Sequence, residues 1–216
     1  GTQSLDFLSY FLGYDAPRKL LLIGQNSDEI RATGGFLGVV VEMNLDKGEL
    51  VGLRYLNSDN VDSPTFETNP IAPEPIFRYL WISRFLFRDS NWNPHFPAAA
   101  TQIADLYQRG QGIEVDGVIA ATDDLTLGLV AALGGVRVPE LPGLLDEATA
   151  RQYVKAELTY PCLPRHASTR SKRCFDEDLF TAILDRLFSP MDTQLRPRVV
   201  QALLGALSSK DMLIHV

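Results

Sequence analysis

The sequence predicts an α/β fold: a single domain with a mixed central β-sheet, an antiparallel hairpin near its start and flanking helices. Three observations favour this class. Two apolar segments, Phe36–Leu45 and Glu49–Leu56, are joined by a three-residue turn. A strand–helix–strand pattern covers residues 115–138, and amphipathic helical segments alternate with the strands. No repeat or linker divides the chain, so we expect one domain over residues 1–216.

The first third of the chain predicts a helix followed by three strands. Residues 3–12 have an amphipathic helical pattern, and Leu20–Ile23 forms an apolar strand. A polar turn from Gln25 to Gly35 precedes the next strand, Phe36–Leu45. In the turn Asp46-Lys47-Gly48 the glycine stands where a hairpin requires a positive φ, so Phe36–Leu45 and Glu49–Leu56 are predicted to pair antiparallel.

The middle of the chain predicts loops between helices. The polar cluster 57–60 ends the hairpin, and the four prolines of 61–75 predict a long irregular loop. Residues 75–87 form an apolar helical segment, and 88–94 follow as a turn. Phe96–Gln108 is predicted to be an amphipathic helix, with Pro97 in its first turn.

The last half predicts mainly helices. A strand at Val115–Ala121 leads into a helix at Leu125–Leu133, for which Thr122 or Asp123 is the N-cap. The remaining predictions are an extended segment at 136–138, a helix from Asp146 or Glu147 to about 157, a basic loop at 160–174, helices at 176–188 and 192–208, and a strand at 214–216.

Composition excludes some partners. The formal charge of −7 and the pI near 5.0 argue against a nucleic-acid-binding protein, because such proteins neutralise phosphates. No run of 18 apolar residues occurs, so no segment is predicted to span a membrane. We nevertheless expect the 216 residues to be cut from a longer membrane-anchored chain, because the sequence stops inside an apolar run.

Complete catalytic signatures are absent from the sequence: it has no GxSxG, GxxxxGK[ST], HExxH or GxGxxG motif. His95, His166 and His215 lie in unlike contexts, which gives little support to a histidine metal site or triad. Cys162 and Cys174 fit either a disulfide, as in an extracytoplasmic protein, or two unpaired thiols.

Arginines, carboxylates and amides at predicted strand ends and loops remain as candidates. Arg31 lies in the first turn, Asp59 at the end of the hairpin, and Arg88-Asp89-Ser90-Asn91 in the middle turn. The late basic loop contains Arg165, Arg170, Lys172 and Arg173. Arginines that converge on a carboxylate-lined pocket would suit a pyrophosphate and a metal. The alternative is that each arginine pairs locally, as Arg88 could with Asp89.

Several segments resemble a bacterial family known as domain of unknown function 4012, which has no established activity. The resemblance rests on Gln25-Asn26, Glu29, Arg31, Thr33-Gly34-Gly35-Phe36, the segment 88–94, and 115–120. It covers most of the chain.

A more distant resemblance is to the LytR-CpsA-Psr family, through Leu20–Phe36, Val115–Val138 and Leu145–Val154 with the basic residues that follow. Those proteins are extracytoplasmic and membrane-anchored, and they transfer glycopolymers from a polyprenyl pyrophosphate carrier. This resemblance implies catalytic roles for Arg31 and Asp59, with Asp59 also the metal ligand for a possible Mg²⁺. It further implies that Arg170 or Arg173 is the late arginine of that family. Candidates for substrate contacts, from their places in turns and loops, are Thr33, Gly34, Arg88, Asp89, Asn91, Arg170 and Arg173.

The chain departs from the LytR-CpsA-Psr pattern at two positions. Where that family has Ser-Asp-Thr after its first arginine, this chain has Thr33-Gly34-Gly35, and Ser58 precedes Asp59 where the family has arginine. An acidic metal ligand and one arginine are therefore replaced.

Two functions follow as hypotheses. The first is an extracytoplasmic cell-envelope domain that binds a polyprenyl-pyrophosphate-linked glycopolymer or transfers it as a phosphotransferase. The second is a non-catalytic envelope module that binds a glycan or a protein. For it, Tyr79, Trp81, Trp92 and Phe96 could stack on sugars, although core positions are the better interpretation of these aromatic residues. A cytoplasmic nucleotide enzyme is a third alternative, but it lacks a phosphate loop.

Overall fold

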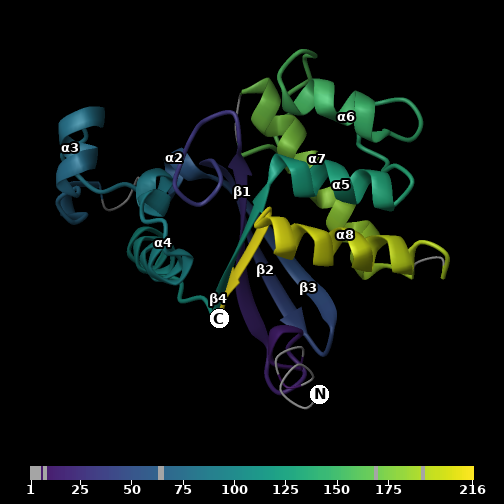
Figure 1. The fold of residues 1–216 in the computed structure, drawn as a ribbon, viewed down its shortest axis with the longest axis horizontal. Helices are drawn as coiled ribbons and strands as arrows, with labels where there is room; N and C mark the ends of the chain where they lie inside the picture. Colours follow the sequence, from purple (N-terminus) through teal and green to yellow (C-terminus); the bar gives the residue numbers. More distant parts are fainter. Residues whose placement is uncertain (1–5, 7–8, 63–65, 168–169, 191–192) are drawn as a thin grey trace. The chain divides into compact units, whose positions relative to one another are not determined.

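The computed structural model describes residues 6, 9–62, 66–167, 170–190 and 193–216 (Figure 1). Five strands form one mixed sheet in the order β3-β2-β1-β4-β5. Their bounds are β1 (Arg18–Asn26), β2 (Phe36–Asp46), β3 (Glu49–Asn57), β4 (Gly117–Thr122) and β5 (Met212–His215). The mixed α/β class predicted from the sequence is thereby confirmed.

The chain forms two compact units. The first comprises Gly1–Ile119 with Ile214–Val216, and the second comprises Ala120–Leu213. Strands β4 and β5 each contribute residues to both units.

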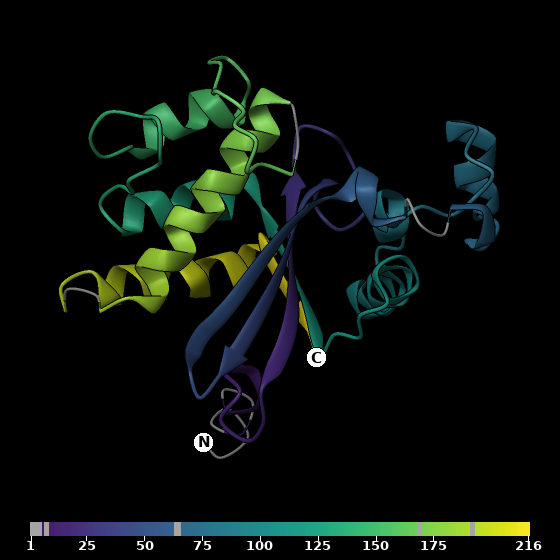
Figure 2. The same cartoon turned by 180° about the vertical axis from the view of Figure 1, so that it is seen from behind.

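The predicted hairpin is confirmed in the first unit. Strand β2 pairs antiparallel with both β1 and β3, and Figure 2 shows the three strands from behind. The turn between β2 and β3 places Lys47 at φ 50° and Gly48 at φ 83°, as a tight hairpin turn requires. Strand β1 lies between β2 and β4, so Leu20, Leu21 and Ile23 are fully buried.

Short helices follow the hairpin in the first unit: α2 (Ser58–Val61), η1 (Phe66–Thr68), α3 (Glu74–Leu80) and η2 (Phe87–Trp92). The polar cluster 57–60 is thus largely the start of α2, and η1 interrupts the predicted loop 61–75. The turn predicted at 88–94 is the 3₁₀ helix η2 for most of its length.

The helix predicted over 75–87 is wrong beyond Leu80. Trp81 adopts the left-handed conformation, with φ 58°, and ends α3. The backbone then turns back and pairs with the segment before α3, through a bridge between Ile71 and Arg84. Residues 83–85 therefore hydrogen-bond across the chain rather than along a helix, with Ala72 donating to the Ser83 carbonyl at 3.0 Å.

Helix α4 (Phe96–Gln111) confirms the predicted amphipathic helix, with Pro97 in its first turn. It packs against η2 and α2, and its buried face includes Ile103, Leu106 and Tyr107. These contacts fix η2 against the end of the strands.

The second unit contains α5 (Asp123–Ala132), α6 (Glu147–Val154), α7 (Ser171–Phe188) and α8 (Arg196–Ser209). Helix α5 packs against α6, α7 and α8. Thr122 is its N-cap and accepts from the Leu125 amide at 3.5 Å, while Asp146 caps α6. The basic loop predicted at 160–174 is shorter than expected, since α7 begins at Ser171.

Of the helix predicted at 3–12, residues 3–5, 7 and 8 lie outside the described residues, and residues 6 and 9–11 are helical. Within the described ranges, no helix has the length and apolar character needed to cross a bilayer.

Candidate functional site

The arginine-bearing turn after β1 is held by a buried amide network. The Asn91 side-chain amide donates to the Gln25 side chain at 3.1 Å, to the Thr33 hydroxyl at 2.9 Å and to the Gly35 carbonyl at 2.8 Å. Thr33 in turn donates to Gln25 at 2.6 Å. Asn91 is completely buried, and Gln25 and Thr33 nearly so. The network therefore fixes both ends of the turn to η2.

Only glycine fits at position 35, because the backbone there lies close to the backbone of Asn26. The φ of Gly35 is 155°, and a Cβ at this position would lie 2.3 Å from the Asn26 carbonyl oxygen. Gly35 is thus explained by backbone packing, and Gly34 by its φ of 126°, which favours glycine.

Four side chains from three elements form a chain of ion pairs, the arginine–aspartate cluster: Arg31, Asp59, Arg88 and Asp89. Arg31 Nη2 lies 3.5 Å from Asp89 Oδ1, and Arg88 Nε lies 3.7 Å from Asp89 Oδ2. Arg88 Nη1 donates to Asp59 Oδ1 at 2.9 Å. The two arginines therefore meet on one buried carboxylate, and Arg88 also holds the carboxylate at the start of α2.

Burial and charge act in opposite directions on this cluster. Burial raises the pKa of Asp89, and the charges of Arg88 and Arg31 oppose that rise. Burial also disfavours the Arg88 guanidinium, but the Asp59 hydrogen bond and the charges of Asp89, Asp59 and Asp62 raise the pKa of Arg88 overall. The Arg88 guanidinium thus stays cationic, while the buried aspartate carries a desolvation cost.

Hydrogen-bonding capacity in the cluster is not fully used. Arg31 Nε, Asp89 Oδ2 and Asn91 Oδ1 are buried and have no hydrogen-bond partner among the described residues. The Arg31 guanidinium also lies over the Phe36 ring, 5.2 Å from its centroid. Buried polar atoms without partners are uncommon in folded proteins and are frequent at ligand sites, where a ligand or water completes the bonding.

A cavity of about 370 Å³ opens beside the cluster. Asp59, Asp62, Phe66, Leu86 and Arg88 line it. Arg88 has five N–H donors; among the described residues, one makes a short hydrogen bond to Asp59 and Nε has a longer pairing with Asp89. Asp62 accepts from the Phe87 amide and from Asn69, both at 2.8 Å, and burial raises its pKa. The cavity therefore offers unused guanidinium donors next to one apolar wall.

Magnesium, which the family resemblance implies, does not fit the described side chains. Among them there is no group of three or more His, Cys, Asp or Glu residues placed to hold a metal. Asp59 accepts from Arg88, and Asp62 is engaged by Asn69 and a backbone amide. The role of Asp59 as a metal ligand stays a prediction. Its contact with Arg88 favours an ion pair with this guanidinium over a bound metal.

The predicted site residues fall into three groups. Arg31, Asp59, Arg88 and Asp89 lie together, as a pyrophosphate site would need. Thr33, Gly34 and Asn91 belong to the turn network or the turn itself, where Thr33 and Asn91 are interior residues. Arg170 and Arg173 belong to the second unit, at the N-cap and first turn of α7, and their substrate contacts stay a prediction.

Two residues of the site were not predicted. Gln25 was noted only for the family resemblance, yet it links Thr33 to Asn91. Asp62 was assigned to an irregular loop. Its spacing of three from Asp59 would place both carboxylates on one face of a helix, but a four-residue helix gives no periodic signal that reveals it.

The Asp116-Gly117 part of the family resemblance stabilises the sheet. Asp116 accepts from the Lys19 amide at 2.8 Å and from Arg18 at 3.2 Å. A Cβ on Gly117 would lie 2.8 Å from the His215 carbonyl oxygen. This motif therefore anchors the start of β1.

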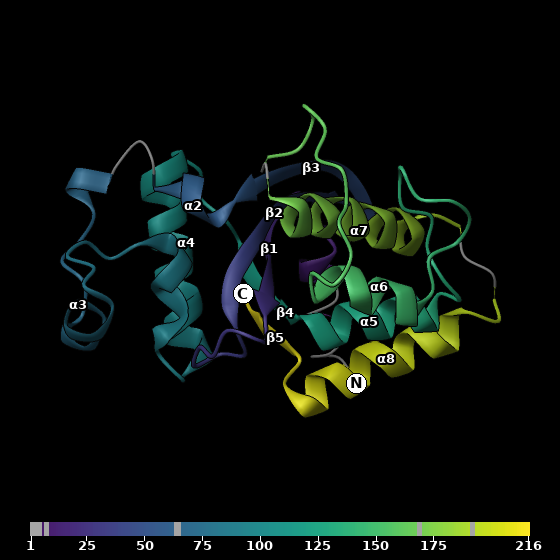
Figure 3. The same ribbon diagram turned by 90° about the horizontal axis from the view of Figure 1, so that it is seen from above.

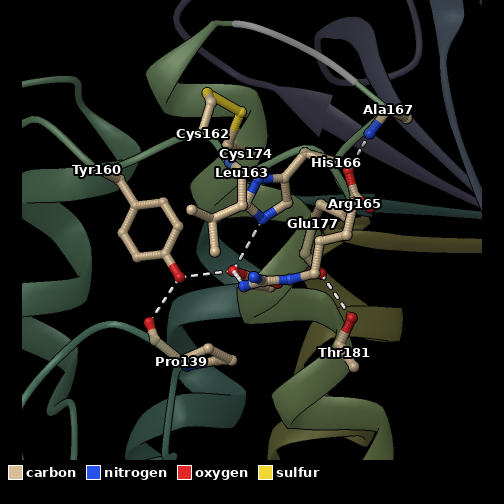
Figure 4. A network of polar contacts seen from close by, with 11 residues as sticks. Pro139, Tyr160, Cys162, Leu163, Arg165, His166, Ala167, Cys174, Glu177 and Thr181 are labelled. Atoms are coloured by element: carbon tan, nitrogen blue, oxygen red, sulfur yellow. Dashed lines mark hydrogen bonds and ion pairs between the residues drawn. A yellow bond between two sulfur atoms is a disulfide. The ribbon is translucent and has the colours of Figure 1, made fainter.

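The late basic loop is organised around Asp178 on α7 (Figure 4). Its Oδ2 atom lies 2.5 Å from the Tyr160 hydroxyl, 2.7 Å from Arg165 Nη2 and 3.0 Å from His166 Nε2. His166 Nδ1 accepts from the Leu163 amide, so Nε2 is the protonated nitrogen that faces Asp178. His166 is thus a structural histidine.

A disulfide closes the same loop. Cys162 and Cys174 are bonded, with their Cα atoms 5.4 Å apart, and this decides between the two alternatives open from the sequence. Figure 4 shows the bond between the labelled Cys162 and Cys174. Arg165 is committed to Asp178, which is the local pairing considered for each arginine.

Comparison with known proteins identifies a family and a fold. A family model described as "Protein of unknown function (DUF4012)" matches residues 15–158. No functionally curated protein matches the chain.

Solved structures of LytR-CpsA-Psr proteins share the fold. TagV of Bacillus subtilis is 11% identical, with a TM-score of 0.54 over 93% of this chain and 74% of TagV. TagU of B. subtilis is also 11% identical, with a TM-score of 0.53 over 93% of this chain and 77% of TagU. TagT, whose structure is described as bound to LI-WTA, is 13% identical, with a TM-score of 0.50 over 93% of this chain and 69% of TagT.

Proposed function

The chain belongs to the DUF4012 family, and we propose that its arginine–aspartate cluster binds the diphosphate of a polyprenyl-linked glycopolymer in the bacterial cell envelope. One observation carries the proposal: Arg31 and Arg88, from separate elements, meet on Asp89 beside a 370 Å³ cavity. A volume of this size is within the usual range for small-ligand sites.

The pair that holds Arg88 is weak enough for a ligand to replace. The Arg88 side chain is 36% exposed and the Asp59 side chain 24% exposed. Ion pairs with this exposure contribute on the order of 0–1 kcal/mol, since water screens them. A diphosphate makes bidentate, charge-assisted hydrogen bonds to a guanidinium, and these are stronger than the single bond from Arg88 to Asp59.

Asp89 has a positioning role in this proposal. It is almost completely buried and faces both arginines, so it holds Arg31 and Arg88 in fixed directions. A preorganised pair of guanidinium groups loses little conformational freedom when an anion binds. Asp59 acts on Arg88 by competing with the ligand, so a role as catalytic carboxylate is not part of the proposal.

Two further observations support the envelope setting. The Cys162–Cys174 disulfide is typical of proteins in oxidising, extracytoplasmic compartments. The fold is that of LytR-CpsA-Psr proteins, of which TagT is described with LI-WTA bound. The proposal is limited to binding, because the described carboxylates do not fit a metal for a transfer step.

Titration with geranyl diphosphate in the presence of a metal chelator tests this function. We expect saturable binding to the wild-type chain and at least about tenfold weaker binding to Arg88→Ala, which loses about 1.4 kcal/mol or more. Arg109→Ala is the matched control, because Arg109 also contacts an aspartate, Asp105, at 2.9 Å but lies on the exposed side of α4. Equal affinity of Arg88→Ala and wild type would remove the proposal.

A further inference from the structure

An exposed apolar surface surrounds α3, away from the arginine–aspartate cluster. We call it the aromatic tip and define it as Ile71, Phe77, Tyr79, Leu80 and Trp81. The exposed fractions reach 90% for Trp81, 78% for Ile71 and 72% for Tyr79. Burial of such side chains is normally favourable by about 1.5–3 kcal/mol each, so their joint exposure indicates a surface with a partner.

Hydrogen bonds between the two segments that flank α3 hold the aromatic tip in place. These two arms, residues 69–72 and 83–85, pair through the Ile71–Arg84 bridge, and Phe85 donates to the Pro70 carbonyl at 2.8 Å. Asn69 ties the arms together, donating to the Phe85 carbonyl at 3.1 Å. In Figure 3, α3 stands apart from α4 and from the strands of its own unit. The exposure is thus built into the backbone.

The side chains of the tip point in several directions around one short helix. Successive helical residues are rotated by about 100°, so Phe77, Tyr79 and Leu80 project from different sides of α3. Only Ile76 of α3 is buried. A protein groove covers one face of a helix, whereas a fluid apolar medium surrounds it. A helix that is apolar on most sides therefore suits a fluid apolar medium.

The chemistry of the tip matches a membrane interface. Trp and Tyr are the residues enriched at the level of lipid headgroups. Arg78 lies over the Tyr79 ring, 5.7 Å from its centroid, and pairs with Glu74, so its charge can stay at the polar level. Residues 66–84 contain Glu67, Glu74, Arg78 and Arg84, which sum to zero, although the whole chain carries −7. The segment around the tip therefore has no net charge that an anionic bilayer would repel.

From these observations we propose that the aromatic tip inserts into the headgroup region of a lipid bilayer. This binding is independent of the diphosphate site. The exposure of Tyr79, Trp81 and Trp92 overturns the expectation that these aromatic residues are core residues, while Phe96 is buried as expected.

Tryptophan fluorescence tests the insertion directly. The chain has two tryptophans, so Trp92→Phe leaves Trp81 as the only reporter. Phosphatidylcholine vesicles, with and without phosphatidylglycerol, are then added. We expect a blue shift of Trp81 emission, quenching by brominated lipid, and pelleting of the protein with the vesicles.

Variants locate the effect. Trp81→Asn keeps a residue that tolerates the left-handed conformation at this position. Together with Tyr79→Ser it should lower the vesicle affinity by about tenfold or more, because it removes two exposed aromatic groups that the bilayer would bury. Val51→Ser on β3 is the matched control, since Val51 is also exposed but lies outside the tip, and it should bind vesicles like wild type. Circular dichroism verifies that each variant is folded.

Other outcomes overturn the insertion. Unchanged Trp81 emission with both vesicle types would do so. Concentration-dependent dimers that Tyr79→Ser abolishes would assign the tip to a second copy of the chain. Pelleting with isolated cell-wall glycan in place of vesicles would assign it to sugar stacking. Geranyl diphosphate titration of the same variants separates these results from failure of the diphosphate site, because tip variants keep Arg31 and Arg88.

Discussion

The Nη2 atom of Arg31 lies 3.5 Å from Oδ1 of Asp89, which joins the turn after β1 to the 3₁₀ helix η2. Asp89 is almost fully buried, whereas Arg31 remains partly accessible. The carboxylate therefore depends on its two arginines for its charged form. This dependence makes the cluster sensitive to the loss of any one member.

Removal of Arg31 should destabilise the fold through Asp89. In Arg31→Ala only Arg88 remains to compensate the buried carboxylate, and we expect a loss of about 1–3 kcal/mol. Asp89→Asn in the Arg31→Ala background should recover much of it, because the uncompensated charge is removed. Urea denaturation of the two single variants, the double variant and wild type measures this coupling. Additive losses would contradict a direct interaction between the two residues.

Asn91 should be more important for stability than either arginine. Asn91→Ala leaves the Gln25 side chain, the Thr33 hydroxyl and the Gly35 carbonyl without their shared donor in a buried site. Loss of these bonds should cost roughly 2–4 kcal/mol. Denaturant titration measures the loss, and Asn93→Ala, in the exposed segment after η2, is the control. A change below about 0.5 kcal/mol would show that the network does not hold the turn.

The pH dependence of stability should contain a contribution from Asp176. Burial raises the pKa of Asp176 from 3.8 to about 6, partly opposed by Lys172. A raised pKa means that the folded state binds this proton more tightly than the unfolded state. The contribution to stability is therefore largest below the unfolded pKa and is lost as pH rises through about 6.

Asp176→Asn isolates that contribution. Between about pH 4 and pH 7 the wild-type free energy of unfolding should fall relative to the variant, by up to roughly 3 kcal/mol for a shift of two units. Paired urea titrations across this range give the difference. Parallel pH profiles for the two proteins would place the Asp176 carboxylate in contact with water.

The disulfide should stabilise the loop around Asp178. Cys162 and Cys174 close a short loop, and such a crosslink contributes about 2–3 kcal/mol by restricting the unfolded chain. Reductant should lower the free energy of unfolding of wild type by that amount, and its urea midpoint should fall accordingly. The Cys162→Ser/Cys174→Ser variant should start from the lower midpoint and not respond to reductant. A midpoint in wild type that reductant leaves unchanged would contradict the prediction.

The sequence was sufficient for features with a local cause. The glycine in Asp46-Lys47-Gly48 predicted the hairpin, and Pro97 marked the start of α4. The helix at 75–87 was extended too far because residues 81–87 are apolar. The Ile71–Arg84 bridge that ends α3 joins residues 13 apart and has no local signal.

The sequence was sufficient to name the residues of the candidate site, but it did not predict which of them are in contact. Arg31, Asp59 and the Arg88-Asp89 pair were named from their places in turns. The shortest contact of Arg88 is to Asp59, 29 residues away, at 2.9 Å, whereas its local pairing with Asp89 is 3.7 Å long. Such distant partners follow from packing of α2 and η2 against β2, which no sequence pattern specifies.

Asp59→Asn tests the central claim most directly, because the two accounts of this residue predict opposite signs. If the cluster binds diphosphate through Arg88, Asp59→Asn frees the guanidinium and removes a negative charge from the cavity. Geranyl diphosphate should then bind more tightly than to wild type in the presence of a chelator, and Asp105→Asn should have no effect. Weaker binding to Asp59→Asn, together with a requirement for Mg²⁺ in wild type, would contradict this account and assign Asp59 to a metal.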